Sequence, residues 1–203
     1  MAVLLDTNIL LRLLQPHHPH CPIAERALVT LRGRGEVLHL AAQNLVEFWA
    51  AITRPVDENG LGLITKQAMA EDDALKRLFI LLPEVPIQEE WERLVVVYRV
   101  SGKNTHDARL VAAMITHRVG SVLTFNVQDF TRYREITAID PTTLGWPTTK
   151  ASLGGLRGTT VASISASRIR MLASRTIIST RHTLASPAQV FEFGHQLLFV
   201  NIR

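Results

Sequence analysis

Cysteine is almost absent from this sequence of 203 residues, and the single Cys21 excludes an internal disulfide. This scarcity fits a reducing compartment, so we expect a cytoplasmic protein. Long apolar runs are missing too. Stretches such as "LVVVY" are too short to cross a bilayer, so no membrane role is expected. The start of the chain lacks the basic residues of a signal peptide, and Asp6 interrupts its first apolar run.

Several motifs of common enzyme classes are also missing. No Gly-rich loop that could cradle a phosphate follows a predicted strand, which argues against nucleotide hydrolysis by that route. No nucleophile-elbow motif supports a serine-type triad. The segment "HHPHC" offers three histidines and a thiol, so a zinc site is one alternative. It lacks the second ligand pair that is typical of structural zinc, and the prolines around it favour a loop.

Acidic residues are nearly absent from residues 148–203, which hold one Asp/Glu, seven Lys/Arg and fourteen Ser/Thr. Residues 1–147 contain 15 basic and 17 acidic residues, so the net charge of +4 comes from the tail. The first 147 residues therefore show no overall basic footprint for nucleic acid. Without sustained periodicity, 148–203 is predicted to be a basic, Ser/Thr-rich extension that is irregular and poorly ordered. A basic arm that holds RNA is the alternative.

Residues 1–147 are predicted to form one domain in which short strands alternate with helices. The strands are expected at 2–5, 36–40, 84–87 (a minor one), 121–125 and 136–139. The helices are expected at 7–14, 23–31, 43–53, 65–81, 89–100 and 105–117. This alternation predicts an α/β fold with a mainly parallel central sheet covered by helices on both faces.

Acidic and amide side chains stand where these strands end. Asp6 follows the first strand, and Glu47 lies on the helix after the second. Asp107 begins a later helix, and Asn126 and Asp129 follow the strand that ends at residue 125. Each acid alone is compatible with a helix-terminus or surface role.

Together, these acids indicate a metal site, because parallel sheets bind ligands at the carboxyl ends of their strands. Carboxylates that meet there repel one another, so they raise their pKa values or recruit a cation. Ligation by oxygen alone suits Mg²⁺ or Mn²⁺. Such an ion can orient a phosphodiester and ionise a water that attacks it.

The segments "LLDTNILLRLL", "NLVEFWAAITRP", "THDARLVAAMITHRVGSVLTFNVQDF" and "ITAIDP" resemble the PIN-domain nucleases. The likeness is greatest to the VapC-type toxins of bacterial and archaeal toxin–antitoxin pairs, and it covers about residues 2–145. It implies a three-layer α/β/α sandwich and an endoribonuclease that depends on Mg²⁺ or Mn²⁺. It also implies an RNA substrate, a cognate antitoxin and a homodimer.

The resemblance places the first three family acids on Asp6, Glu47 and Asp107. The fourth position falls on Asn126, where many members have Asp, and a further acid falls on Asp129. We therefore expect metal ligation by Asp6, Asp107, Glu47 and Asp129. Asn126 brings a carbonyl oxygen but no charge, so we expect one well-held ion and a second that arrives only with substrate.

The polar neighbours of these acids are expected to support them. Thr7, Asn8 and Thr124 are predicted to hydrogen-bond the carboxylates and fix their orientation, although Asn8 is equally compatible with a helix start. His106 and Arg109 are candidate substrate contacts, through a proton or a phosphate, or else structural residues.

Rival functions remain open at this stage. A phospho-aspartate enzyme built on Asp6 would want a second Asp at Asn8, or a Lys after the strand ending at Phe125, and the sequence has neither. A decayed PIN protein that binds antitoxin or RNA without cutting is a second alternative. An RNA-processing PIN nuclease without an antitoxin is a third. Chelator-sensitive RNA cleavage would exclude the decayed form, and an adjacent antitoxin gene would exclude the third.

Overall fold

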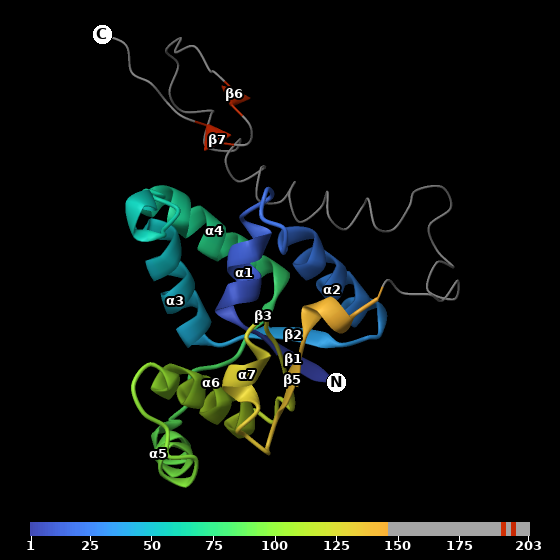
Figure 1. Cartoon of the computed structure of the whole chain (residues 1–203), viewed down its shortest axis with the longest axis vertical. Coiled ribbons are helices and arrows are strands. Elements are labelled where there is room, and N and C mark those ends of the chain that lie inside the picture. Colours follow the sequence, from blue (N-terminus) through green and yellow to red (C-terminus); the bar gives the residue numbers. More distant parts are fainter. Residues whose placement is uncertain (146–191, 194–195, 198–203) are drawn as a thin grey trace.

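The computed structural model describes residues 1–145 and two short paired strands near the C-terminus (Figure 1). Five strands form one sheet in the order β3-β2-β1-β4-β5, and every neighbouring pair is parallel. They are β1 (Ala2–Leu5), β2 (Val37–Leu40), β3 (Ile80–Leu81), β4 (Ser121–Leu123) and β5 (Thr137–Ile139). Apart from the antiparallel pair β6 (Glu192–Phe193) and β7 (Gln196–Leu197), the predicted extension 148–203 lies outside the described residues.

Helices cover both faces of this sheet (Figure 1). One face carries α1 (Thr7–Leu13), α2 (Cys21–Gly33), α3 (Ala42–Thr53) and α4 (Thr65–Leu78). The other carries α5 (Gln88–Val97), α6 (Asn104–Thr116) and α7 (Val127–Phe130), and 3₁₀ turns lie at Val56–Glu58 and Pro141–Thr143. None of the helices within the described residues is long and apolar enough to cross a membrane. The three-layer α/β/α sandwich with a parallel sheet is confirmed.

The central strand β1 divides the interior into two apolar cores. Val3 and Leu5 point into the core under α1–α4, whereas Leu4 points into the core under α5 and α6. In β4, Leu123 and Val122 alternate in the same way. Successive strand residues face opposite sides of a sheet, so a strand buried on both faces must be apolar throughout. This requirement explains the continuous apolar run at the start of the chain.

The third strand was not predicted where it lies. The helix expected at 65–81 ends at Leu78, and Ile80–Leu81 pair with β2 as the edge strand β3, while no strand forms at 84–87. The prediction of a minor strand at 84–87 is therefore wrong. Both residues of β3 are exposed, and two residues at a sheet edge are too few to show a period of two. Pro86 also leaves the backbone near it without an N–H for a ladder.

The strand order puts a topological switch point beside β1. The chain moves from β1 to β2 and then β3 on one side, whereas β4 and β5 lie on the other. The Asp6 backbone N–H, one residue after β1, donates to the Leu123 carbonyl of β4 over 3.0 Å. In parallel sheets, ligands bind at the carboxyl ends of the strands at such a point. This edge is therefore where the functional side chains are expected.

Within the part of the chain that the structure describes, every residue of both cores precedes residue 146, so we expect a chain that ends at residue 147 to fold without the extension. Removal of the extension should change the free energy of unfolding by less than about 1 kcal/mol. The thermal unfolding midpoint of the truncated chain should therefore lie within about 2 °C of that of the full chain. Calorimetry of the two chains measures the difference. A truncated chain that unfolds much earlier, or without cooperativity, would contradict the domain boundary at 147.

Candidate active site

The Asp6 carboxylate is oriented by one side chain from α1 and one that follows β4. Its Oδ2 atom accepts hydrogen bonds from Asn8 Nδ2 (2.7 Å) and from Thr124 Oγ1 (2.6 Å). The Thr124 hydroxyl oxygen in turn accepts from Asn8 Nδ2 (3.0 Å) and from the Asn126 backbone N–H (2.9 Å). Asn8 Oδ1 accepts from the Phe125 N–H over 3.2 Å. The loops after β1 and β4 are thus tied together around one carboxylate.

The Glu47 carboxylate is held by a second group of neutral donors. Thr7 Oγ1 donates to its Oε2 (2.8 Å), and Gln43 Nε2, one helical turn away on α3, donates to its Oε1 (2.6 Å). The fully buried Asn44 donates from Nδ2 to Thr7 Oγ1 (3.2 Å) and accepts from the Ala41 N–H at the start of α3 (2.9 Å). Because Thr7 follows Asp6 directly, these bonds bring Glu47 to the end of β1.

Gln43 connects this network to α6. Its Nε2 also donates to the His106 backbone carbonyl (2.9 Å), and its Oε1 accepts from Arg109 Nη1 (3.1 Å). The first turn of α6, which carries Asp107, is therefore fixed against the helix that carries Glu47. The His106 side chain is exposed, and Arg109 contacts an amide here. The substrate roles of both residues remain predictions.

Burial and a neighbouring negative charge raise the pKa of Asp6 to about 6 from an ordinary value of 3.8. Burial is the largest cause, and the charge of Glu47 adds to it, whereas hydrogen bonds from Thr124, Thr7 and Asn8 oppose it. A carboxylate that keeps a raised pKa despite these donors is ionised at neutral pH at a free-energy cost.

Asp107 shows the same effect from the other side of the site. Its pKa rises to about 6, first through burial and then through the negative charges of Asp129, Asp6 and Glu47, while Arg132 lowers it. Asp107 is therefore close enough to the other three acids to be repelled by each of them, and Asp6 is close enough to Glu47. The four acids arrive from the end of β1, from α3, from α6 and from the short α7.

The fourth predicted position lies at the start of α7. Asn126 is the N-cap residue of this helix and is exposed, and Asp129 stands in its first turn. Asp129 adds a charge that acts on Asp107, whereas the amide of Asn126 adds none. The negative charge of the site is thus concentrated in four carboxylates.

A divalent cation fits the chemistry of this donor set, although no group of three His, Cys, Asp or Glu within the described residues is arranged to hold one as the side chains lie. Asp6 and Glu47 point their oxygens at the donors Asn8, Thr124, Thr7 and Gln43. Oxygen ligands with unrelieved negative charge are those that Mg²⁺ and Mn²⁺ select. The acids that would hold the ion are Asp6, Glu47, Asp107 and Asp129.

The histidine-rich segment considered for zinc lies beside this site. The His20 ring stacks on Phe125, with ring centroids 4.4 Å apart and planes 13° apart, and His18 meets His20 edge to face at 5.1 Å. Cys21 is buried as the first residue of α2. The His20 ring therefore packs against the residue that follows Thr124.

Sequence reasoning missed Gln43 and Asn44, which hold Glu47 in place. Their spacing was the available signal, because residues three and four positions before Glu47 on a helix share its face. Trp49 and Trp91, two of the three tryptophans of the sequence, are partly buried against the two cores. Trp49 packs against the core under α1–α4, and Trp91 donates from Nε1 to the Thr105 carbonyl (3.1 Å) beside the other core.

The sequence model of the PIN domain matches residues 3–136, and the chain belongs to this family. PIN domains are in general nucleases and typically use divalent metals, which supports a hydrolase that acts on nucleic acid. No curated protein matches the chain at a significant level.

Solved structures share its fold at low sequence identity. VapBC2 from Rickettsia felis, bound to a DNA fragment from its promoter, has a TM-score of 0.53 and 14% identity, covering 68% of this chain and 98% of that one. VapBC-1 from nontypeable Haemophilus influenzae has a TM-score of 0.52 and 20% identity, with coverage of 70% and 99%. FitAcB from Neisseria gonorrhoeae has a TM-score of 0.51 and 18% identity, also with coverage of 70% and 99%.

The raised pKa of Asp6 predicts how stability varies with pH when no divalent cation is present. Below about pH 4 the acid is protonated in both the folded and the unfolded chain, and between about 4 and 6 only the folded chain keeps the proton. The free energy of unfolding should therefore fall as pH rises through this window and level off above it. At pH 7 the loss attributable to Asp6 is on the order of 3 kcal/mol.

Replacement Asp6→Asn should remove this loss. Denaturant unfolding in chelator-treated buffer should show the variant as stable as wild type near pH 4 and more stable at pH 7. The exposed Asp57→Asn is the matched control and should follow wild type throughout. An Asp6→Asn curve parallel to that of wild type would mean that Asp6 is not under electrostatic strain.

Proposed function

We propose that this chain is a cytoplasmic, metal-dependent endoribonuclease that acts as the toxin of a two-protein toxin–antitoxin module. The observation that carries the proposal is the repulsion of Asp107 by Asp6, Glu47 and Asp129, and of Asp6 by Glu47, although these acids come from four separate segments. Isolated capping or surface acids have no reason to meet in this way. Membership of the PIN domain family supports the same activity.

The reaction is hydrolysis of an RNA phosphodiester. A water oxygen forms a bond to phosphorus, the bond from phosphorus to one ribose oxygen breaks, and that oxygen takes up a proton. When bound, a Mg²⁺ or Mn²⁺ ion would orient the phosphate, promote ionisation of the attacking water and stabilise the charge that develops on phosphorus. Asp6, Glu47, Asp107 and Asp129 would hold this ion at the edge of the sheet.

The neutral side chains around the acids position them. Asn8 and Thr124 fix Asp6 by two hydrogen bonds to one oxygen, and Thr7 and Gln43 fix Glu47 by one bond to each oxygen. Neutral donors orient a carboxylate without cancelling its charge, so the acids stay attractive to a cation. Partners of this kind hold the ligands of metal sites in place.

A cognate antitoxin is the proposed partner. The support is the VapC-type resemblance of the sequence together with the fold shared with structures described as VapBC-1 and VapBC2. An extended or helical antitoxin segment that enters a groove near the acids would use ordinary modes of peptide docking. A homodimer is proposed on the same resemblance.

One feature favours a second candidate, a PIN protein that binds antitoxin or RNA without cutting. Asn126 stands where many family members carry Asp, so the site lacks one charge at the start of α7. A second cation is held less tightly by a neutral carbonyl oxygen than by a carboxylate. The two candidates differ in turnover, which an assay with Mn²⁺ and structured RNA measures directly.

Wild-type protein with Mn²⁺ should cut RNA, and a chelator should stop the cleavage. Asp6→Asn and Asp107→Asn should each lower the rate on the order of 100-fold or more, because each removes a charged metal ligand. Mutation of residues that only hydrogen-bond a metal ligand already lowers activity about 10–100-fold. Circular dichroism should show both variants folded, and Asp57→Asn should cut like wild type. If both site variants retain the wild-type rate, the nuclease assignment is wrong. RNA binding without turnover by wild type would favour the second candidate.

Asn126→Asp tests the account of the fourth position. The added carboxylate should tighten binding of a second Mn²⁺ and raise the cleavage rate at limiting metal, because ligand charge sets the affinity of such sites. Calorimetric titration gives the number of ions bound, and Gln128→Glu on the same short helix is the control for an added charge. An unchanged stoichiometry in Asn126→Asp would remove Asn126 from the metal site.

A further inference from the structure

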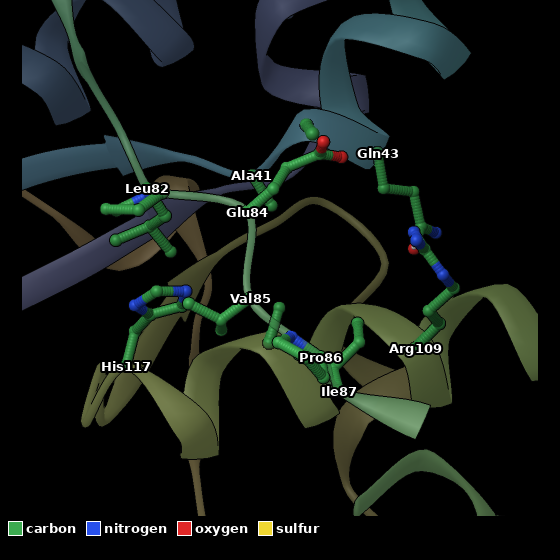
Figure 2. A pocket seen from close by; sticks show the side chains of 12 residues that line it. Ala41, Gln43, Leu82, Glu84, Val85, Pro86, Ile87, Arg109 and His117 are labelled. Atoms are coloured by element: carbon green, nitrogen blue, oxygen red, sulfur yellow. Dashed lines mark hydrogen bonds between the residues drawn. The ribbon is translucent and has the colours of Figure 1, made fainter. Parts of the chain in front are cut away.

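A cavity of about 350 Å³ lies on the other side of Gln43 from the carboxylates. Its walls are the start of α3, the loop of residues 82–87 that joins β3 to α5, and one face of α6 (Figure 2). Arg109 and Gln43 stand at one end in this view, and His117 and Leu82 stand at the other. The volume lies within the range of about 300–1,000 Å³ that small-molecule pockets occupy.

A single side chain, that of Gln43, links the cavity wall to the active site. Gln43 Nε2 donates to Glu47 over 2.6 Å, while Gln43 Oε1 accepts from Arg109 over 3.1 Å. Gln43 is buried, and both of its side-chain polar atoms are hydrogen-bonded. A group bound beside Arg109 therefore lies one residue away from an acid of the proposed catalytic set.

The walls combine apolar surface with a few polar groups. Leu82, Val85, Pro86 and Ile87 from the loop form the apolar side, which faces the small Ala113 of α6. Arg109, Ala113 and His117 recur every four residues, so they share one stripe of the helix. The small side chain of Ala113 in the middle of this stripe leaves room for the cavity, and Arg109 and His117 lie at the two ends of the stripe.

This chemistry matches a nucleotide. A nucleobase has two apolar faces and a polar edge, and its phosphate needs a cation. An arginine carries five N–H donors in a planar fork, so Arg109 can meet a phosphate oxygen and keep its bond to Gln43. The imidazole of His117 and the carboxylate of Glu84, which also lines the cavity, can accept or donate hydrogen bonds at a base edge. RNA bases that are splayed out of a strand are read in this way.

We propose that this cavity binds one nucleotide of the RNA substrate next to the cleaved phosphodiester and so sets the base preference of the enzyme. The base lies between the 82–87 loop and Ala113, and Arg109 holds the phosphate that leads to the metal site. The inference rests on the proposed function, because it takes RNA as the substrate. Arg109 is here a substrate-binding residue, and Gln43 positions it relative to Glu47.

Binding can be measured without catalysis. The full chain, labelled at the methyl groups of Val, Ile and Ala, is titrated by NMR with AMP, GMP, CMP and UMP in chelator-treated buffer. At least one nucleotide should shift the methyl signals of Val85, Ile87 and Ala113. Val85→Trp, which fills the cavity from an exposed loop position, should weaken binding about tenfold or more. Val96→Trp is the matched control, since Val96 is exposed on α5 and does not line the cavity.

His117→Ala provides a second variant should the bulky residue disturb the loop. It should change which nucleotide binds best, because it removes a hydrogen-bonding group at the base end. No shift at these methyl groups with any nucleotide, or equal binding by wild type, Val85→Trp and His117→Ala, would overturn the proposal.

Cleavage mapping separates this inference from the proposed function. Total RNA is cut with Mn²⁺, and the new ends are sequenced. Wild type and Val96→Trp should prefer one base at a fixed position beside the cut, and Val85→Trp should lose that preference. If all variants cut RNA with the same base preference, the proposed role of the cavity is wrong and the nuclease assignment is kept. If nucleotides bind in the cavity but no RNA is cut, the nuclease assignment is wrong and nucleotide binding in the cavity is kept.

Discussion

Repulsion between carboxylates at the end of β1 is the constraint on which the rest of the site depends. Asp6 and Asp107 both have a pKa raised to about 6, and each is affected by the charge of Glu47. A folded chain could relieve this repulsion by pairing each acid with a nearby base. Asp6 and Glu47 are instead held by neutral donors, Thr7, Asn8, Gln43 and Thr124, which keep their negative charge in place. Keeping these acids close together lowers the stability of the folded chain when no cation is bound. A bound cation would compensate for this cost, which is the reason we propose for the arrangement.

The strand order of the sheet brings these acids together. β1 lies between β2 and β4, so the segments that follow these three strands meet at one edge of the sheet. Thr124 at the end of β4 reaches Asp6 across this edge, and Gln43 at the start of α3 reaches α6. The same glutamine separates the acids from the neighbouring cavity. The proposed positions for the metal, the phosphate and the base are therefore neighbours, and buried amides and hydroxyls hold the side chains that form them.

The layers of the fold and the positions of the acids could be predicted from the sequence, because both depend on strong local patterns. The apolar run before Asp6 predicts a buried parallel strand, and a polar residue directly after such a strand must lie at the sheet edge. β3 could not be predicted, since two exposed residues at an edge carry no periodic signal. Gln43 and Asn44 were missed for a different reason. Their function depends on contacts with α6 and Thr7, which are distant in sequence, and amides on a helix also occur on ordinary surfaces.

Calorimetric titration of Mn²⁺ into the full chain tests the central claim most directly, because a cation that binds carboxylates with raised pKa values must displace their protons. At pH 6, repeated in buffers of different ionisation enthalpy, binding should release protons, and the release should decline as the pH is raised to about 8, two units above the pKa of Asp6 and Asp107. Replacement Asp107→Asn should reduce both the affinity and the protons released. Equal Mn²⁺ binding by wild type and Asp107→Asn, with no proton release at pH 6, would contradict the account.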